Sequence, residues 1–263
     1  QLKFMLDDGG IDNSFGTRNF KWSYWGSRTS DGCALGYLLL AKNNPVFGVA
    51  ALKNINLLNE CTYDGLLHGG PHYKQIGEPP CVHHTFAHAK VLTAILDHGL
   101  EDIKGFGELP RKSLVGLEYF KDVDTYQVGF KNYTATITGY DWEYLKGGHA
   151  SGGAMTMLWS SKLGVIISAS MSEYTMKEPN NMQLPKFKNH ECLTPRIEYN
   201  QEDGLYNNLY DYCSKLSPDN SNDCYSITVK GNLKNIDLEK INTIESMYNI
   251  NYKNKIKGFI HTN

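Results

Sequence analysis

The first third of the chain carries apolar residues at helical spacing. Proline and capping signals predict one helix over residues 32–42, a second over 45–60 that begins at Pro45, and a third that follows Pro80 and reaches about His98. The third helix has one apolar stripe, made of Val82, Phe86, Ala89, Leu92 or Thr93, and Leu96. We expect this stripe to pack against neighbouring helices, so that the region consists of helical hairpins.

From about Arg111 the spacing of apolar residues becomes that of strands. Four segments rich in β-branched and aromatic residues predict antiparallel strands: Tyr126–Phe130, Tyr133–Thr138, Ala154–Trp159 and Val165–Met171. The sequence Lys162-Leu163-Gly164 is suited to the hairpin turn between the last two. Because the strands follow the helices instead of alternating with them, the order predicts an α+β protein with domains 1–110 and 111–263.

The composition is that of a globular protein with little electrostatic attraction for nucleic acid. The 263 residues are 41% hydrophobic and carry a formal net charge of -2, without the basic excess that nucleic-acid binding needs. The longest apolar run, Ala34–Ala41, is far shorter than the ~20 residues of a membrane helix. The chain starts at Gln1 without a signal peptide, from which we expect a processed or excised piece of a longer protein.

The cysteines give no sign of a thiolate metal site. All six lie at irregular spacing and form no CxxC pair, which disfavours structural zinc and thioredoxin-like chemistry. Cys213 and Cys224 flank a polar loop. Two interpretations stay open for this pair, a disulfide in an exported protein or two free thiols.

The segment Asp64–Tyr73 has the highest density of chemically active side chains. It places His68, His72 and Tyr73 in a turn that is broken by glycine and proline. Imidazole and phenol are the neutral groups best able to exchange a proton with a substrate near neutral pH. The segment therefore predicts proton-transfer groups directed into a cleft; the alternative is that its histidines satisfy local backbone groups.

This segment resembles one in toroidal polysaccharide lyases of the heparinase II/III and alginate-lyase type. In that family, Asp-Gly, four residues, Gly-Pro, any residue and Tyr supply the catalytic tyrosine. The matching residues here are Asp64, Gly65, Gly70, Pro71 and Tyr73, with Gly69 where the family has Glu. The resemblance implies the C-terminal portion of such an enzyme: a partial (α/α) toroid of helical hairpins in residues 1–110, followed by an antiparallel β-sandwich in residues 111–263.

A second, looser resemblance concerns His149. The glycine-rich segment 147–154 leads into a predicted strand, as does the lyase segment in which a histidine and small residues enter a strand beside the glycan cleft. Ser or Gly stands here where the family has Asp after that histidine. The resemblance implies a cleft position for His149, and the alternative is a plain turn between strands.

Residues 12–28 mix amides, guanidinium groups and aromatic rings without helical or strand periodicity. Aromatic faces stack on sugar rings, while Arg and Asn bind carboxylate or sulfate. We therefore expect a recognition loop for an acidic glycan; the alternative is an aromatic loop with internal ion pairs. The candidate substrate-binding residues, together with Trp142 from the second domain, are Asn13, Arg18, Trp22, Tyr24, Trp25 and Arg28.

The resemblance also implies roles in β-elimination at a uronic acid. Tyr73 is the implied proton donor to the leaving O4 and a candidate base. Asn19 or Asn13, assisted by Arg18, would neutralise the uronate carboxylate. The histidine that follows this asparagine in the family is absent here, so His68 and His72 are the nearest candidates for the base.

A metal site and cofactors find little support in the sequence. His84 and His88 share a face of the third predicted helix, which is a spacing that can bind zinc, but the Glu of an HExxH motif is missing. The alternative is a helix face that lines a polar cleft. No nucleotide or redox cofactor is indicated and none is required for β-elimination, while a divalent metal, zinc or calcium, stays open.

These observations predict a polysaccharide lyase that acts on a uronic-acid-containing glycan, in the periplasm or outside the cell. Its expected partners are an acidic polysaccharide or oligosaccharide and the missing N-terminal half of a toroid, with no nucleic acid and no membrane span. One rival is a toroidal glycoside hydrolase that draws two carboxylates from Asp7, Asp8, Asp12, Asp31 and Asp64. The other is a non-catalytic glycan-binding protein that uses Trp22, Trp25 and Trp142.

Overall fold

The computed structural model describes residues 1–15, 33–68, 75, 80, 82–130, 132–139, 152–169, 194–221, 224–235, 237, 239–251 and 256–262. The chain divides into two compact units, and each is described by itself. Unit 1 comprises Gln1–Asp12, Tyr24–Ser113 and Thr175–Lys188. Unit 2 comprises Asn13–Ser23, Leu114–Tyr174 and Asn189–Asn263.

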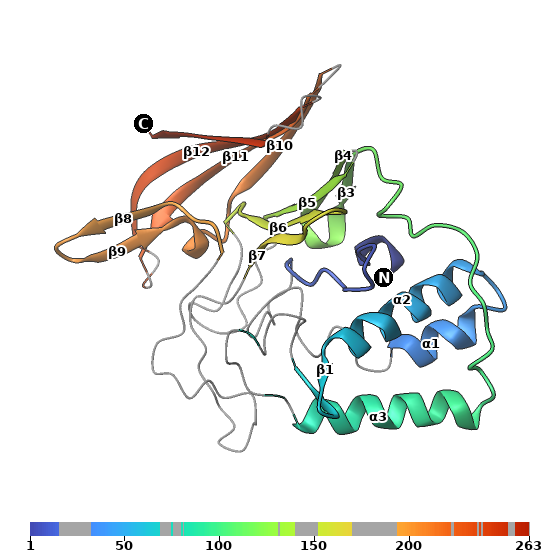
Figure 1. The fold of residues 1–263 in the computed structure, drawn as a ribbon. Coiled ribbons are helices and arrows are strands. Elements are labelled where there is room, and N and C mark those ends of the chain that lie inside the picture. Colours follow the sequence, from blue (N-terminus) through green and yellow to red (C-terminus); the bar gives the residue numbers. More distant parts are fainter. Residues whose placement is uncertain are drawn as a thin grey trace. The chain divides into compact units, whose positions relative to one another are not determined.

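Unit 1 contains the described α-helices, which Figure 1 shows in blue to green. The elements are a short 3-10 helix η1 (Leu2–Phe4), α1 (Cys33–Leu40), α2 (Val46–Glu60), β1 (Thr62–Tyr63), β2 (Leu66–Leu67) and α3 (Val82–Asp97). These helix ranges confirm the three helices predicted from the sequence. Helix α1 contacts both α2 and α3, and the core between them includes Leu38, Ala50 and Ile95.

The segment that follows α3 lies directly on the backbone of α2. A Cβ built at Gly105 would come within 1.9 Å of the Val49 nitrogen, so only glycine fits at this close approach. The next residue, Phe106, donates its N–H to the carbonyl oxygen of Pro45 at 3.3 Å. The start of α2 and the segment 105–106 are therefore fixed to each other within unit 1.

The prediction of a partial (α/α) toroid is wrong. A toroid needs a ring of helical hairpins, whereas the part of the chain that the structure describes holds three α-helices, of 8, 15 and 16 residues. Most of the other described elements are antiparallel strands. The helical pattern in the sequence thus identifies single helices correctly but carries no information about a ring of them.

The apolar stripe predicted on α3 does not pack as expected. Val82, Phe86 and Leu96 are 39%, 72% and 62% exposed, and Ala89 and Leu92 are exposed as well. The buried residues of α3 are His84, His88 and Ile95. The helix therefore turns its histidine-bearing face inward within unit 1, because Ile95, together with Val91, joins the core on that side.

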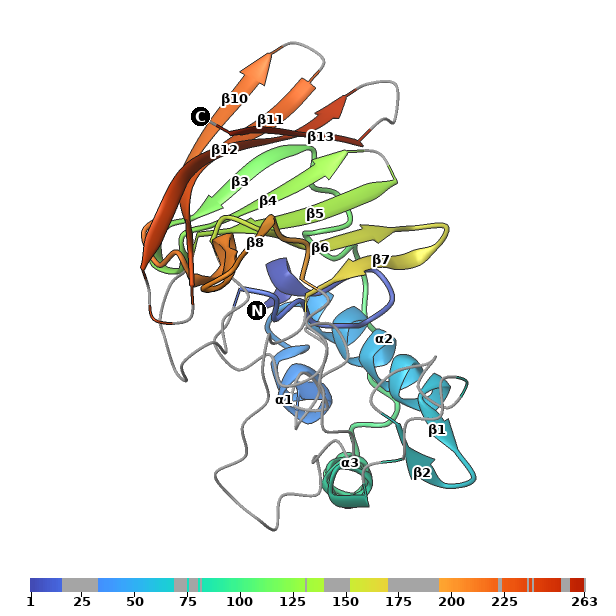
Figure 2. The ribbon, with the colours of Figure 1, turned by 90° about the vertical axis from the view of Figure 1, so that its left-hand side faces the viewer.

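Unit 2 contains two antiparallel sheets, which the two views separate clearly (Figures 1 and 2). The first has the order β3 (Gly116–Phe120), β4 (Thr125–Phe130), β5 (Tyr133–Thr138), β6 (Met155–Ser160) and β7 (Gly164–Ser168). The second contains β8 (Glu198–Gln201), β9 (Gly204–Asn207), β10 (Lys215–Ser221), β11 (Cys224–Lys234), β12 (Lys240–Asn251) and β13 (Ile256–Thr262). Its order is β13-β12-β11-β9-β8, with β10 also paired to β11.

Side chains from both sheets form one core in unit 2. Val128, Ala135 and Ile137 of the first sheet belong to the same buried cluster as Ile227 and Val229 of β11. Strands β4 to β7 confirm the four strands predicted from alternation, and Gly164 begins β7 with a φ of 71°, as the predicted turn requires. The sheets thus pack face to face in the manner of a β-sandwich.

The other face of β4 and β5 is polar although it is buried. Thr125 and Thr138 are fully buried and share a hydrogen bond of 2.9 Å between their hydroxyls. Gln127, opposite Thr136 in the register, is also fully buried. Neither polar atom of the Gln127 side chain has a hydrogen-bond partner in the described part of the chain. A buried amide in this state destabilises the fold by about 1–3 kcal/mol.

Gln127→Met is therefore expected to raise the free energy of unfolding by about 1 kcal/mol, because a side chain of similar volume removes the cost of the buried amide. Chemical denaturation of the purified protein measures this change. Thr125→Val is the matched control on the same strand: it removes one partner of a hydrogen bond that is made, and we expect it to be destabilising by about 1 kcal/mol. Equal destabilisation by both variants would contradict this account of Gln127.

Candidate functional site

The residues that lead into the His/Tyr segment form a tight hairpin in unit 1. Thr62 pairs with Leu67 and Tyr63 with Leu66, and the two residues between the strands, Asp64 and Gly65, have φ values of 52° and 76°. Two positive φ values are typical of a two-residue hairpin turn, for which Asp-Gly is a favoured sequence. Asp64 and Gly65 of the lyase-like motif thus form a β-turn, which the sequence interpretation missed.

Two hydrogen bonds fix the end of this hairpin. The Leu67 N–H donates to the Thr85 hydroxyl of α3 at 2.9 Å. The His68 N–H donates to the Cys61 carbonyl oxygen at the end of α2, also at 2.9 Å. Since α2 and α3 both hold the hairpin, the chain enters the segment 69–73 from a defined point.

The His68 side chain is buried next to this hairpin. It is 8% exposed, and its ring lies edge-on to the ring of Tyr63 with a centroid separation of 5.4 Å. This geometry fixes the orientation of the imidazole. Such burial suits a group that positions the following turn better than one that meets a bulky glycan directly.

Most of the predicted site lies outside the described residues. Asn13 is described and half-buried, at the start of unit 2. The predicted residues that lie outside are Arg18, Asn19, Trp22, Tyr24, Trp25, Arg28, His72, Tyr73, Trp142 and His149. Their convergence on one cleft stays a prediction.

The histidines of α3 are buried. His84 and His88 are 2% and 5% exposed, and the ring of His84 contacts that of His83 edge-on at 5.2 Å. Within the described ranges, no group of three His, Cys, Asp or Glu side chains is arranged to hold a metal ion. These two side chains therefore pack inside unit 1 without a third metal ligand from the described part.

Cys61 is a buried free thiol. Burial, followed by the charges of Glu60 and Asp8, raises the pKa of Cys61 to about 12. Its thiol stays protonated at neutral pH, so it is unsuited to be a nucleophile. Cys213 is also a free thiol, so it forms no disulfide with Cys224.

The carboxylates of the rival hydrolase are largely engaged in structural contacts. Asp7 pairs with Lys53 at 2.8 Å, and Asp12 pairs with Arg111 at 2.6 Å in a buried ion pair. Asp8 accepts the Gly10 N–H at 3.0 Å. Asp31 lies outside the described residues. Asp7 and Asp12 are thus held in ion pairs, which makes them poorly suited to be the acid and base of a hydrolase.

Comparison with known proteins identifies the class of protein. The ulvan lyase N-terminal domain model matches residues 1–112. The ulvan lyase C-terminal domain model matches residues 117–262 and by itself covers more than half of the chain. The chain therefore belongs to the ulvan lyase family, and the prediction of a polysaccharide lyase is confirmed at this level. The assignment to heparinase II/III-like enzymes is not supported.

A curated relative agrees with this membership. The chain is 44% identical over 256 residues to a broad-specificity ulvan lyase from Formosa agariphila. The match covers 95% of this chain, and the chain spans 40% of the length of that relative. No solved structure is a significant match to the chain.

None of the described helices is both long and apolar enough to cross a membrane.

Proposed function

We propose that the natural protein that carries this chain cleaves ulvan by β-elimination. The observation that carries this proposal is the match to ulvan lyases across both units, with 44% identity to an enzyme named for that activity. Neither the hydrolase nor the non-catalytic alternative is favoured by this match. The polysaccharide substrate leads us to propose action outside the cytoplasm, in the periplasm or beyond the cell.

The proposed reaction starts at a uronic acid residue of the polymer. A base removes the C5 proton, the C4–O4 bond breaks, and a double bond forms between C4 and C5. The departing O4 takes a proton, so that atoms and charge balance without any added water. An amide from Asn19 or Asn13, assisted by Arg18, neutralises the carboxylate and thereby stabilises the charge that develops when the C5 proton leaves.

We assign proton donation to Tyr73, with the phenol or His72 as the base. Both residues follow a hairpin whose end is held by Thr85 and Cys61. We propose His68 as a positioning residue, since it is buried against Tyr63. His149 keeps its proposed place beside the cleft.

A substrate panel tests this function. The natural protein is incubated separately with ulvan, alginate, glucuronan, heparan sulfate and chondroitin, and ultraviolet absorbance reports the unsaturated uronide. We expect absorbance to rise with ulvan and to rise little with the other glycans. New reducing ends without absorbance would indicate the hydrolase, and binding to ulvan without any product would indicate the non-catalytic alternative.

A further inference from the structure

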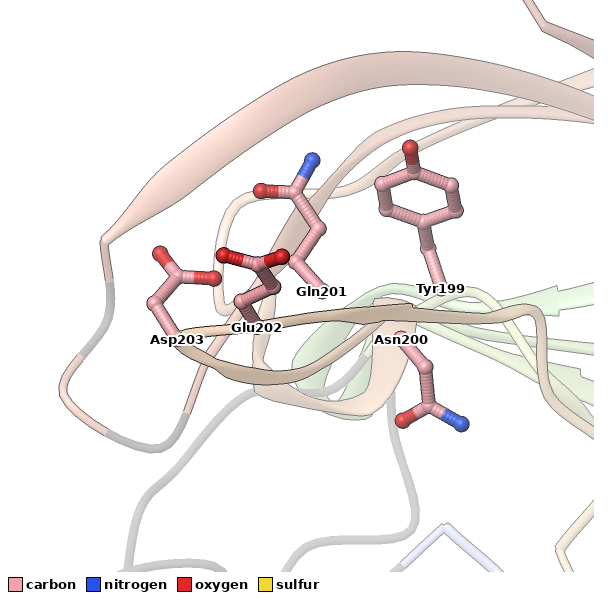
Figure 3. A pocket seen from close by; sticks show the side chains of 5 residues that line it. All are labelled: Tyr199, Asn200, Gln201, Glu202 and Asp203. Carbon is pink, nitrogen blue, oxygen red and sulfur yellow. The ribbon is translucent and has the colours of Figure 1, made fainter.

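The β8–β9 hairpin of unit 2 faces an open recess with a volume of about 770 Å³. The described residues that line it are Tyr199, Asn200, Gln201, Glu202 and Asp203. Figure 3 shows the side chains of Tyr199, Gln201, Glu202 and Asp203 on one side of the hairpin and Asn200 on the other. Strand alternation accounts for the opposite sides of Asn200 and its neighbours Tyr199 and Gln201 on β8, while Glu202 and Asp203 belong to the turn that follows. One side of the hairpin thus presents a phenol ring, an amide and two carboxylates.

Pairing with β9 (Gly204–Asn207), in which Tyr206 is buried, holds these groups in place. Tyr199 pairs with Tyr206, and Gln201 pairs with Gly204 across the turn. Tyr206 is 4% exposed and packs with Leu233. Its hydroxyl donates to Asp203 Oδ2 at 2.8 Å, and this hydrogen bond raises the pKa of Tyr206. The Asp203 carboxylate is therefore fixed by a buried side chain before any ligand arrives.

Tyr199 differs from Tyr206 in being available to a ligand. It is 45% exposed, and its ring makes no stacking contact with another ring of the described part. Gln201 and Glu202 are exposed as well. An exposed flat ring beside hydrogen-bonding amide and carboxylate groups suits a sugar, whose ring stacks while its hydroxyls donate and accept.

We propose that this recess is a second glycan-binding subsite, and that it takes an uncharged sugar unit. The ring of Tyr199 would stack on the sugar, and Gln201, Glu202 and Asp203 would bind its hydroxyls. Two carboxylates in one recess repel the carboxylate or sulfate of an acidic sugar. The subsite uses none of the residues that we assign to catalysis.

A divalent cation suits the described groups less well. Calcium takes six to eight oxygen ligands, and magnesium needs about six in a near-ideal octahedron. One carboxylate oxygen of Asp203 already accepts a hydrogen bond from Tyr206. Few anionic ligands are then left for a cation, namely the Glu202 carboxylate and the other oxygen of Asp203. The ring of Tyr199 would also have no role in such a site. The carboxylates are therefore best explained as acceptors for sugar hydroxyls.

Calorimetry with neutral and acidic oligosaccharides tests the proposal. The probes are xylohexaose and cellohexaose as uncharged chains and a polygalacturonate hexamer as the charged one, each with and without calcium. We expect Tyr199→Ala to weaken binding of a neutral probe about tenfold, because it removes the stacking surface. Tyr119→Ala is the matched control, since Tyr119 is 46% exposed on β3 of the same unit, and it should leave binding unchanged.

Three results would overturn the proposal: no binding of either neutral probe at millimolar concentration, equal binding by the Tyr199→Ala variant, or binding that requires calcium or favours the acidic probe. The proposed subsite depends on the proposed function in one respect, namely that its ligand is a glycan. Ulvan cleavage is measured in parallel, so failure of the subsite and failure of the lyase activity are seen separately. Circular dichroism of both variants confirms that each is folded.

Discussion

Tyr73→Phe is expected to reduce turnover of ulvan by about 100-fold or more while changing the affinity for the polymer little. The substitution removes one hydroxyl and keeps the ring, and loss of a general acid has an effect of this size. Steady-state kinetics with the natural protein would show the effect in kcat, with KM near its original value. A purely structural tyrosine predicts near-normal kcat and a stability loss of about 1 kcal/mol.

The control for this experiment is Tyr119→Phe. The Tyr119 hydroxyl donates a hydrogen bond to Asp124 Oδ1 at 2.8 Å on the surface of unit 2. Loss of this hydroxyl should leave turnover unchanged. Full activity in Tyr73→Phe would contradict the proposed mechanism. The acid would then have to be sought among His72, His149 and His68.

Arg111→Ala is expected to lower the free energy of unfolding by about 3–5 kcal/mol. The Arg111 and Asp12 side chains are 1% and 0% exposed, and their charged atoms are 2.6 Å apart. Removing the guanidinium leaves the Asp12 carboxylate buried without its cationic partner, which is far more costly than losing a surface pair. Thermal or chemical denaturation of the purified protein measures the change.

The neighbouring lysine provides the control. Lys112 is 46% exposed and contacts Glu108 at 3.5 Å and Asp7 at 3.9 Å, so Lys112→Ala should cost at most about 1 kcal/mol. If Arg111→Ala and Lys112→Ala destabilise the protein equally, the buried ion pair is not a major source of stability in unit 1.

The elements that the sequence predicted well are those with strong local signals. Pro45 precedes α2, and β-branched and aromatic residues mark β4 and β5. Strands β1 and β2 were missed because two residues each are too short for alternation to show. Their Asp64-Gly65 turn carried a usable signal, since this dipeptide is typical of tight hairpins. Local patterns therefore located elements, while the toroid came from resemblance alone and was wrong.

Contacts between residues far apart in the chain could not be predicted from the sequence. Asp12 and Arg111 are 99 positions apart, and nothing in their spacing predicts a contact. On α3, periodicity defined the stripe of Phe86 and Leu96 but not which face would be buried, and the structure buries His84 and His88 instead. The roles assigned to Tyr73 and His149 stay predictions, because both residues lie outside the described part of the chain.

Digestion of ulvan in ¹⁸O-labelled water tests the central claim most directly. β-Elimination adds no water, so after a short digestion the mass spectrum should show unlabelled oligosaccharides, in which each new non-reducing end is a uronic acid with a double bond between C4 and C5. Hydrolysis adds one water at each cleavage and would introduce ¹⁸O at each new reducing end. Unlabelled, unsaturated products are the result that this account predicts, and labelled, saturated products would contradict it.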